Sequence, residues 1–471
     1  MSGVKKAGHD WVVKSVNTPV TKSEMVPYLE YAKENELDTS EVQSFCESER
    51  IQIEHFYHLK EHVFSPFCYW DKQLFQSFAA LDQGFLSWDI MANSFSGRLK
   101  KVQQLMKEKN YESLLMMTET IGQHLVFETI YEEIPVSERY ELFMDMHVTH
   151  DYGIDVFPIE LVRDAISHQK KSERNRAIKR LKERVDVQDG KITVYRGMGN
   201  ESTSVEKAMS WTISEKVAYF FANRLGKEGR VVQGIVDVEH IIDYITRRNE
   251  DEVIILPGNV VITEAEEMVS TETEIRSLEE SGLITEYQSM RDYFIKSEYY
   301  ESPYGVHGVG HVRRVLLHCI SLANAIGLSE QERGILMLSA CYHDIGRKHD
   351  EACEYHGEWS LEKMRDLDLD TFFIVQDGDG GVYPEYLTAE EMEAVEFIIR
   401  YHCKSDEDGV NAMNDIQDPT VKKLVQKLFP IFKDADALDR VRISDLNLNF
   451  LRTKESRQRV KFAEDVLLFL Q

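Results

Sequence analysis

The stretch GILMLSACYHDIG, residues 334–346, decides what the C-terminal part of this chain can be. Its apolar residues recur at the spacing of one helical face and a glycine ends the run, which predicts a buried helix over residues 331–345. His343 and Asp344 would then lie at the C-terminal end of that helix. Imidazole nitrogen and carboxylate oxygen are good ligands for Mn, Fe, Co, Ni or Zn, so the pair predicts a site for one divalent cation.

The dipeptide His-Asp occurs four times in the chain, so its surroundings must distinguish the copies. Upstream of His343, a segment with an apolar helical stripe begins at His311. Downstream follow His356, His402 and Asp436. A group of polar side chains on apolar helices has to be paired or bind a metal.

This ordered set resembles the HD-domain superfamily of metal-dependent phosphohydrolases over about residues 301–445. The resemblance implies an all-α domain that binds one or two divalent transition-metal ions. The metal ligands that it implies are His311, His343, Asp344 and Asp436, with His356 and His402 for a second metal or the substrate phosphate. Asp344 is also expected to take the proton from the attacking water. The alternative is a degenerate HD fold that serves only as a scaffold.

Four further side chains of this region have simpler interpretations. Arg314 or His307 is expected to hold substrate phosphate, with a surface salt bridge as the equal alternative for Arg314. His318 and His349 are expected to be structural.

A compact α+β core is predicted between about residues 186 and 263. Short β-branched runs at 192–195, 230–238 and 252–256 indicate strands, and residues 214–224 indicate a helix. Three short pieces lie on these elements: Val194-Tyr195-Arg196-Gly197, then Ser210-Trp211-Thr212, then residues 247–254 with Glu250 and Glu252. Each alone is typical of an ordinary salt bridge, a helix cap or a solvated acid.

Together the three pieces resemble the Arg-Ser-Glu class of mono-ADP-ribosyltransferases over about residues 190–260. The resemblance implies NAD as cofactor and a protein arginine as acceptor. It implies that Arg196 binds the NAD phosphates or ribose. Ser210, with Thr212 helping, would support the nicotinamide pocket and position the glutamate. Glu252 would be the catalytic carboxylate, and Glu250 would activate the acceptor. Trp211 departs from the pattern, and its bulk is expected to reshape the pocket.

The predicted fold class is therefore multidomain, with a helical N-terminal region, an α+β ADP-ribosyltransferase-like core and an all-α HD domain. The predicted divisions are a helical region of unknown role at 1–150, the transferase-like domain at 151–263 or from near 60, a helical connector at 264–300, and the HD domain at 301–471. Continuous helix is expected over 40–63 and 98–126, and a helix break at Pro430.

Composition narrows the classes of partner. The 82 acidic residues outnumber the 55 basic ones, for a formal net charge of −27, which disfavours a broad nucleic-acid platform and anionic membranes. The basic stretch 168–184 is interpreted as a solvated helix face, with a phosphate-facing patch as the alternative. The scattered cysteines without a CxxC pair and the lack of a long apolar run favour a cytoplasmic protein, or host cytosol for a delivered effector.

The leading hypothesis is a bifunctional enzyme that transfers ADP-ribose from NAD to protein and hydrolyses a phosphate ester or nucleotide, in sequence or in opposition. A second hypothesis keeps only the HD hydrolase, acting on a nucleotide or cyclic dinucleotide, with the middle domain sensing NAD or ADP-ribose. A third is an ADP-ribosyltransferase acting on RNA or another nucleic acid or on a nucleotide. A fourth is a non-enzymatic acidic effector whose helical half binds a partner protein.

Overall fold

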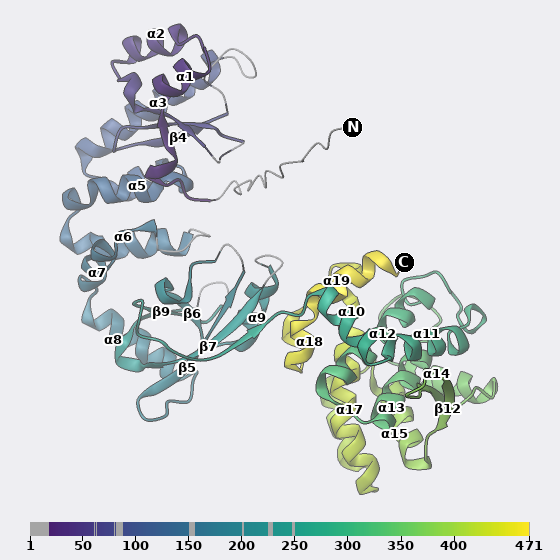
Figure 1. Ribbon diagram of the computed structural model, residues 1–471. Helices are drawn as coiled ribbons and strands as arrows, with labels where there is room; N and C mark the ends of the chain where they lie inside the picture. Colours follow the sequence, from purple (N-terminus) through teal and green to yellow (C-terminus); the bar gives the residue numbers. More distant parts are fainter. Residues whose placement is uncertain are drawn as a thin grey trace. The chain divides into compact units, whose positions relative to one another are not determined.

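The computed structural model describes residues 18–60, 62, 64–79, 81, 88–149, 156–199, 202–224, 229–246 and 250–470 (Figure 1). The chain forms two compact units. The first comprises Met1–Val194, Ser202–Ile213 and Ile235–Val261, and the second comprises Tyr195–Glu201, Ser214–Gly234 and Ile262–Gln471. The predicted boundaries at 150, 263 and 300 stay predictions.

The first unit contains a sheet that the sequence did not predict. Four antiparallel strands pair in the order β1-β2-β3-β4: β1 Met25–Pro27, β2 Phe56–Leu59, β3 Phe67–Trp70 and β4 Phe75–Phe78. The helix expected over 40–63 ends as α2 at Glu49, where Arg50 adopts a left-handed φ of 58°. Aromatic residues then form β2, since their cross-strand packing outweighs the helical spacing.

The helix expected over 98–126 is three helices. Lys109 has a φ of 53°, and the Asn110 side chain accepts a hydrogen bond from Ser113 N to start the second of them. The helices of this part are α1 Tyr28–Glu34, α2 Ser40–Glu49, α3 Trp88–Glu108, α4 Tyr111–Met117, α5 Thr120–Ile130, α6 Val136–Thr149, α7 Ile159–Ser167 and α8 Lys171–Lys182.

A six-stranded sheet in the order β10-β7-β5-β6-β9-β8 follows, and the division between the two units runs through it. Its elements are β5 Lys191–Met198, β6 Ser210–Thr212, α9 Glu215–Arg224, β7 Arg230–Asp237, β8 Ile241–Ile245, β9 Glu252–Ile255 and β10 Val261–Glu267. The predicted strands near 192, 230 and 252 and the predicted helix at 214–224 are confirmed.

The basic stretch covers an edge of this sheet. Arg174 Nε donates to Ile241 O at 2.9 Å, and Arg180 Nη2 donates to Tyr244 O at 3.0 Å. Both acceptors belong to β8, the terminal strand in the sheet order. Two of its arginines therefore donate to edge carbonyls. Arg176, Lys179 and Lys182 of the same helix are exposed, as on a solvated helix face.

The rest of the second unit is mostly helical and has one large hydrophobic core. Its helices are α10 Thr271–Glu280, α11 Leu283–Phe294, α12 Val309–Ile326, α13 Glu330–Tyr342, α14 His356–Asp366, α15 Ala389–Tyr401, α16 Asp406–Asp415, α17 Pro419–Leu438, α18 Lys454–Gln458 and α19 Val460–Phe469. An antiparallel hairpin, β11 Phe372–Gln376 and β12 Val382–Tyr386, lies between α14 and α15 in the chain.

Residues 264–300 were expected to be a connector, and that division stays a prediction. In the structure, α10 and α11 contribute Leu278, Met290 and Phe294 to the same core as α12 and α13. One local expectation was wrong in this unit. Pro430 does not end a helix but lies inside α17. The buried side chains Phe429 and Phe432 on either side of it pack into the core, which outweighs the missing proline hydrogen bond.

Candidate metal centre

The six residues predicted as metal ligands lie at or beside helix ends. His311 is near the start of α12, and His343 and Asp344 directly follow α13. His356 begins α14, His402 directly follows α15, and Asp436 is in the last turn of α17. Capping boxes fix two of these helices at their far ends: Ser329 with Glu332 begins α13, and Thr388 with Glu391 begins α15.

The first half of the cluster gathers around the Nε2 atom of His311. This nitrogen lies 3.2 Å from His343 Nε2, 3.5 Å from Asp344 Oδ2 and 3.3 Å from Asp436 Oδ1. His311, His343 and Asp344 are all buried.

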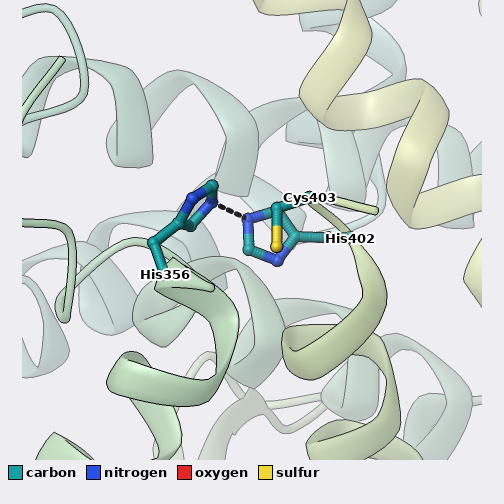
Figure 2. A group of neighbouring side chains, drawn as sticks. All are labelled: His356, His402 and Cys403. Carbon is teal, nitrogen blue, oxygen red and sulfur yellow. Dashed lines mark hydrogen bonds between the residues drawn. The ribbon is translucent and has the colours of Figure 1, made fainter. Parts of the chain in front are cut away.

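The second half gathers around the other oxygen of Asp344. Its Oδ1 atom lies 3.1 Å from His356 Nε2 and 3.5 Å from His402 Nε2, and the two nitrogens are 2.9 Å apart (Figure 2). The carboxylate of Asp344 therefore stands between two pairs of histidines, with one oxygen toward each pair.

Hydrogen bonds at the far ring nitrogens orient the imidazoles. His343 Nδ1 lies 2.9 Å from Ala340 O, and His402 Nδ1 lies 2.7 Å from Ile399 O. A carbonyl only accepts, so in both rings Nδ1 carries the proton and Nε2 presents a lone pair to the cluster. A carbonyl behind the ring is the usual support of a metal-binding histidine.

The charges in the cluster favour a cation. Burial lowers the pKa of His343 to about 3, so this ring is neutral at pH 7. Burial acts to raise the pKa of Asp344, but the surrounding histidines outweigh it and hold that pKa well below the usual range. Asp344 Oδ1 is buried and accepts no hydrogen bond from the residues that the structure describes. A buried carboxylate beside neutral imidazole lone pairs fits a divalent metal.

Residues 308–441 match the family model described as HD domain. The match contains all six residues of the cluster, and an HD domain implies a metal-dependent phosphohydrolase. It does not include the middle of the chain, so the ADP-ribosyltransferase resemblance rests on its short motifs alone. No curated protein and no solved structure matches the chain. Among the described residues, no helix is long and apolar enough to cross a membrane.

Behind the HD domain's first histidine lies Asp439, which sequence reasoning missed. Its Oδ2 atom is 2.7 Å from His311 Nδ1, and the residue is fully buried. Burial acts to raise its pKa, but the hydrogen bonds from His311 and Arg314 lower it to about 2. The sequence spacing could have indicated Asp439, because it follows Asp436 by three residues and so shares its helical face.

Arg314 supports this aspartate. Its Nε donates to Asp439 Oδ1 at 2.5 Å, and its Nη1 donates to Leu470 O at 3.0 Å. The residue is 6% exposed, so its ion pair is buried and is not a surface salt bridge. The expected phosphate role of Arg314 stays a prediction. Arg442 adds a second cation, with Nη1 3.2 Å from Asp439 Oδ2.

The remaining histidines of this region have contacts of their own. His307 Nδ1 is 3.0 Å from Asp350 Oδ1, which belongs to another of the His-Asp pairs. The His307 ring also packs edge-on against His311, with ring centroids 5.6 Å apart. His318 is fully buried against the Phe462 ring, as a structural residue would be, and His349 is exposed. Arg347, which sequence reasoning did not single out, places Nη1 3.1 Å from His356 Nδ1.

In the first unit, Glu252 lies on the same sheet face as the serine motif. Thr212 pairs with Glu252 across β6 and β9, and Ser210 Oγ donates to Glu252 Oε1 at 2.5 Å. His147 of α6, which carried no sequence signal, places Nε2 3.1 Å from the same oxygen. Thr212 Oγ1 donates to the backbone oxygen of Glu250 at 2.7 Å.

The other parts of the transferase motif are placed less completely. Arg196 is on β5 in the second unit, so its position relative to Ser210 and Glu252 is not described. Residues 247–249 lie outside the described residues. Trp211 is buried on β6, and side chains alternate along a strand. It therefore points away from the face of Ser210, so its bulk does not reshape a pocket on that face.

Proposed function

We propose that the HD domain hydrolyses a phosphate ester of a nucleotide or a related small molecule at a centre of two divalent metal ions. The observation that carries the proposal is the position of Asp344, whose two oxygens face separate histidine pairs. His311, His343, Asp344 and Asp436 would hold one ion. His356 and His402 would hold the other and share Asp344.

Bound divalent ions lower the pKa of water and polarise a phosphoryl oxygen. The chain's own residues supply the charge balance and the orientation. Asp344 would act as a ligand, because both of its oxygens face histidines. Its expected second role, taking the proton from the attacking water, stays a prediction, and a pKa held well below the usual range does not favour it. Arg347 beside His356 is suited to bind a phosphate oxygen, since a guanidinium pairs with phosphate in a planar fork.

The test begins with the full chain stripped of metal by a chelator. Mn, Fe(II), Co, Ni and Zn are restored one at a time, and hydrolysis of a generic phosphomonoester, a phosphodiester, nucleotides and cyclic dinucleotides is followed. The proposal expects hydrolysis that is absent from the stripped protein and restored by at least one of these ions. Equal rates with and without metal would contradict it.

The second candidate is transfer of ADP-ribose at Glu252. The hydrogen bond from Ser210 Oγ to Glu252 Oε1 favours it, because positioning the glutamate is the role that the resemblance assigns to this serine. A fixed carboxylate would stabilise the positive charge that develops on the ribose when the bond to nicotinamide breaks. NAD as cofactor and a protein arginine as acceptor belong to this proposal, as does the alternative in which the middle domain only senses NAD. Release of nicotinamide tests it.

A further inference from the structure

The second half of the metal centre contains a sulfur atom that the six predicted ligands do not include. Cys403 follows His402 directly, and its sulfur forms a group with His356 and His402 (Figure 2). The ligand atoms of these three residues all lie within 4.8 Å of one another. Ligand atoms around a tetrahedral zinc ion are about 3.3–3.8 Å apart, so small side-chain movements bring the group to coordination distance.

The contacts of this sulfur are weak. Cys403 Sγ lies 3.3 Å from Glu354 O and 3.9 Å from Arg400 O, and the cysteine forms no disulfide. A thiol is a poor hydrogen-bond donor, so little is lost when the sulfur turns toward an ion.

A fourth possible donor atom lies beside the two histidines of this group. Asp344 Oδ1 is buried without a hydrogen bond, and it lies 3.1 Å from His356 Nε2 and 3.5 Å from His402 Nε2. Two imidazole nitrogens, one carboxylate oxygen and one sulfur make a four-atom donor set, which is the number that Zn²⁺ prefers.

The backbone keeps these donors together. A Cβ atom on Gly357, the second residue of α14, would lie 2.2 Å from Ile399 O and 2.9 Å from Arg400 O. Only glycine lets the start of α14 approach the end of α15 so closely. Ile399 O is the acceptor for His402 Nδ1, so this approach and the orientation of His402 depend on the same carbonyl.

We propose that Cys403 is a thiolate ligand of the second metal ion, together with His356, His402 and Asp344. This inference rests on the proposed two-metal hydrolase, and it limits which metal ions can occupy the second position. A thiolate selects borderline-soft ions such as Zn²⁺, Fe²⁺ or Co²⁺ over Mn²⁺ at this position. When the metal binds, the thiol proton of Cys403 is released to solvent. The first ion would be held by nitrogen and oxygen atoms alone, so the choice of metal there is not limited by a thiolate.

Cobalt substitution tests the inference, because a thiolate bound to Co²⁺ gives a charge-transfer band in the near ultraviolet. The full chain is stripped, loaded with Co²⁺ and compared with Cys403→Ser, Cys403→Asp and the control Cys353→Ser. The half-exposed Cys353 belongs to no group of possible metal ligands among the described residues. Bound cobalt per chain and phosphodiester hydrolysis are measured on the same samples.

We expect the band in the wild type and in Cys353→Ser, and its loss in both Cys403 variants. Affinity for the second ion should fall at least about tenfold in Cys403→Ser and recover in part in Cys403→Asp, which restores an anionic donor. A wild type that binds cobalt without the band, or a band that survives Cys403→Ser, overturns the inference. If metal-dependent hydrolysis persists in that case, the proposed function stands; if no cobalt binds at all, both fall.

Discussion

His311 Nδ1 lies 2.7 Å from Asp439 Oδ2, and this buried pair links the cluster of candidate metal ligands to two arginines. The carboxylate fixes which nitrogen of His311 faces the cluster, as outer carboxylates do for metal-binding histidines. Arg314 and Arg442 in turn hold the carboxylate, whose own charge is therefore compensated within the protein.

The first prediction concerns this support. Asp439→Asn should weaken metal binding by about 10–100-fold, because the amide orients His311 less well and raises its basicity less. Metal affinity is measured by competition with a chromogenic chelator, with circular dichroism as the check on folding. Asp445→Asn, at an exposed pair with Arg440, is the control and should bind metal as the wild type does. Unchanged affinity in folded Asp439→Asn would refute the supporting role.

The second prediction concerns the approach of α14 to α15. Gly357→Ala should lower the free energy of unfolding by about 1–3 kcal/mol, because the new methyl group must push the Ile399 carbonyl away. It should also weaken binding of the second metal ion, since His356 and His402 move apart. Gly378→Ala, where a Cβ meets nothing within 4 Å, should change the free energy by less than about 0.5 kcal/mol. The free energy of unfolding is measured with urea, and bound metal per chain is measured on the same variants. A Gly357→Ala protein with the stability and metal content of the wild type would contradict the prediction.

The third prediction concerns His318, which is fully buried and has no hydrogen-bond partner among the described residues at either ring nitrogen. Burial lowers its pKa from 6.5 to about 4. At a pH between these two values, the unfolded chain binds a proton at this ring that the folded chain does not bind. The free energy of unfolding therefore has its full value above pH 6.5 as far as His318 is concerned, and it falls as the pH drops from 6.5 toward 4. The full loss is about 3 kcal/mol.

His318→Leu should remove that part of the pH dependence and be at least as stable as the wild type at pH 7, because no unpaired ring nitrogen remains buried. Urea unfolding of both proteins at pH 4.5, 5.5 and 7 gives the difference. A difference in free energy that stays constant with pH would show that His318 does not titrate as described.

The fourth prediction tests the second candidate function. Purified protein should release nicotinamide from NAD, more so with a cell lysate as acceptor, and Glu252→Gln should reduce release by at least about a hundredfold. Ser210→Ala should reduce it less, because the serine only positions the carboxylate. Glu239→Gln, an exposed residue, serves as the control. Release by Glu252→Gln at the wild-type rate, or no release from the wild type, would rule out the transferase.

Features that depend on local sequence patterns could be predicted in this chain, whereas contacts between residues far apart in the sequence could not. The apolar spacing before His343 predicted α13, which ends at Tyr342, three residues before the expected end. The ordered histidines predicted residues that lie together, and their role as ligands stays a prediction. Asp439 and Arg314 are 125 residues apart, so no local pattern could pair them. The same holds for His147 and Glu252.

Where local signals competed, tertiary packing decided. Residues 40–63 carry a helical apolar spacing throughout, yet the aromatic residues from Phe56 onward pair as a strand with β3. Pro430 would stop an isolated helix, but the core around Phe429 and Phe432 keeps α17 continuous.

The most direct test of the central claim is the metal content and phosphodiester hydrolysis of Asp344→Asn beside His349→Ala, which alters the first residue of the next His-Asp pair. The account predicts that Asp344→Asn loses bound metal from both positions and at least about a hundredfold of its hydrolysis, because one carboxylate serves both. His349→Ala, with its exposed side chain, should match the wild type. An Asp344→Asn protein that keeps two ions and wild-type hydrolysis would contradict the shared metal centre.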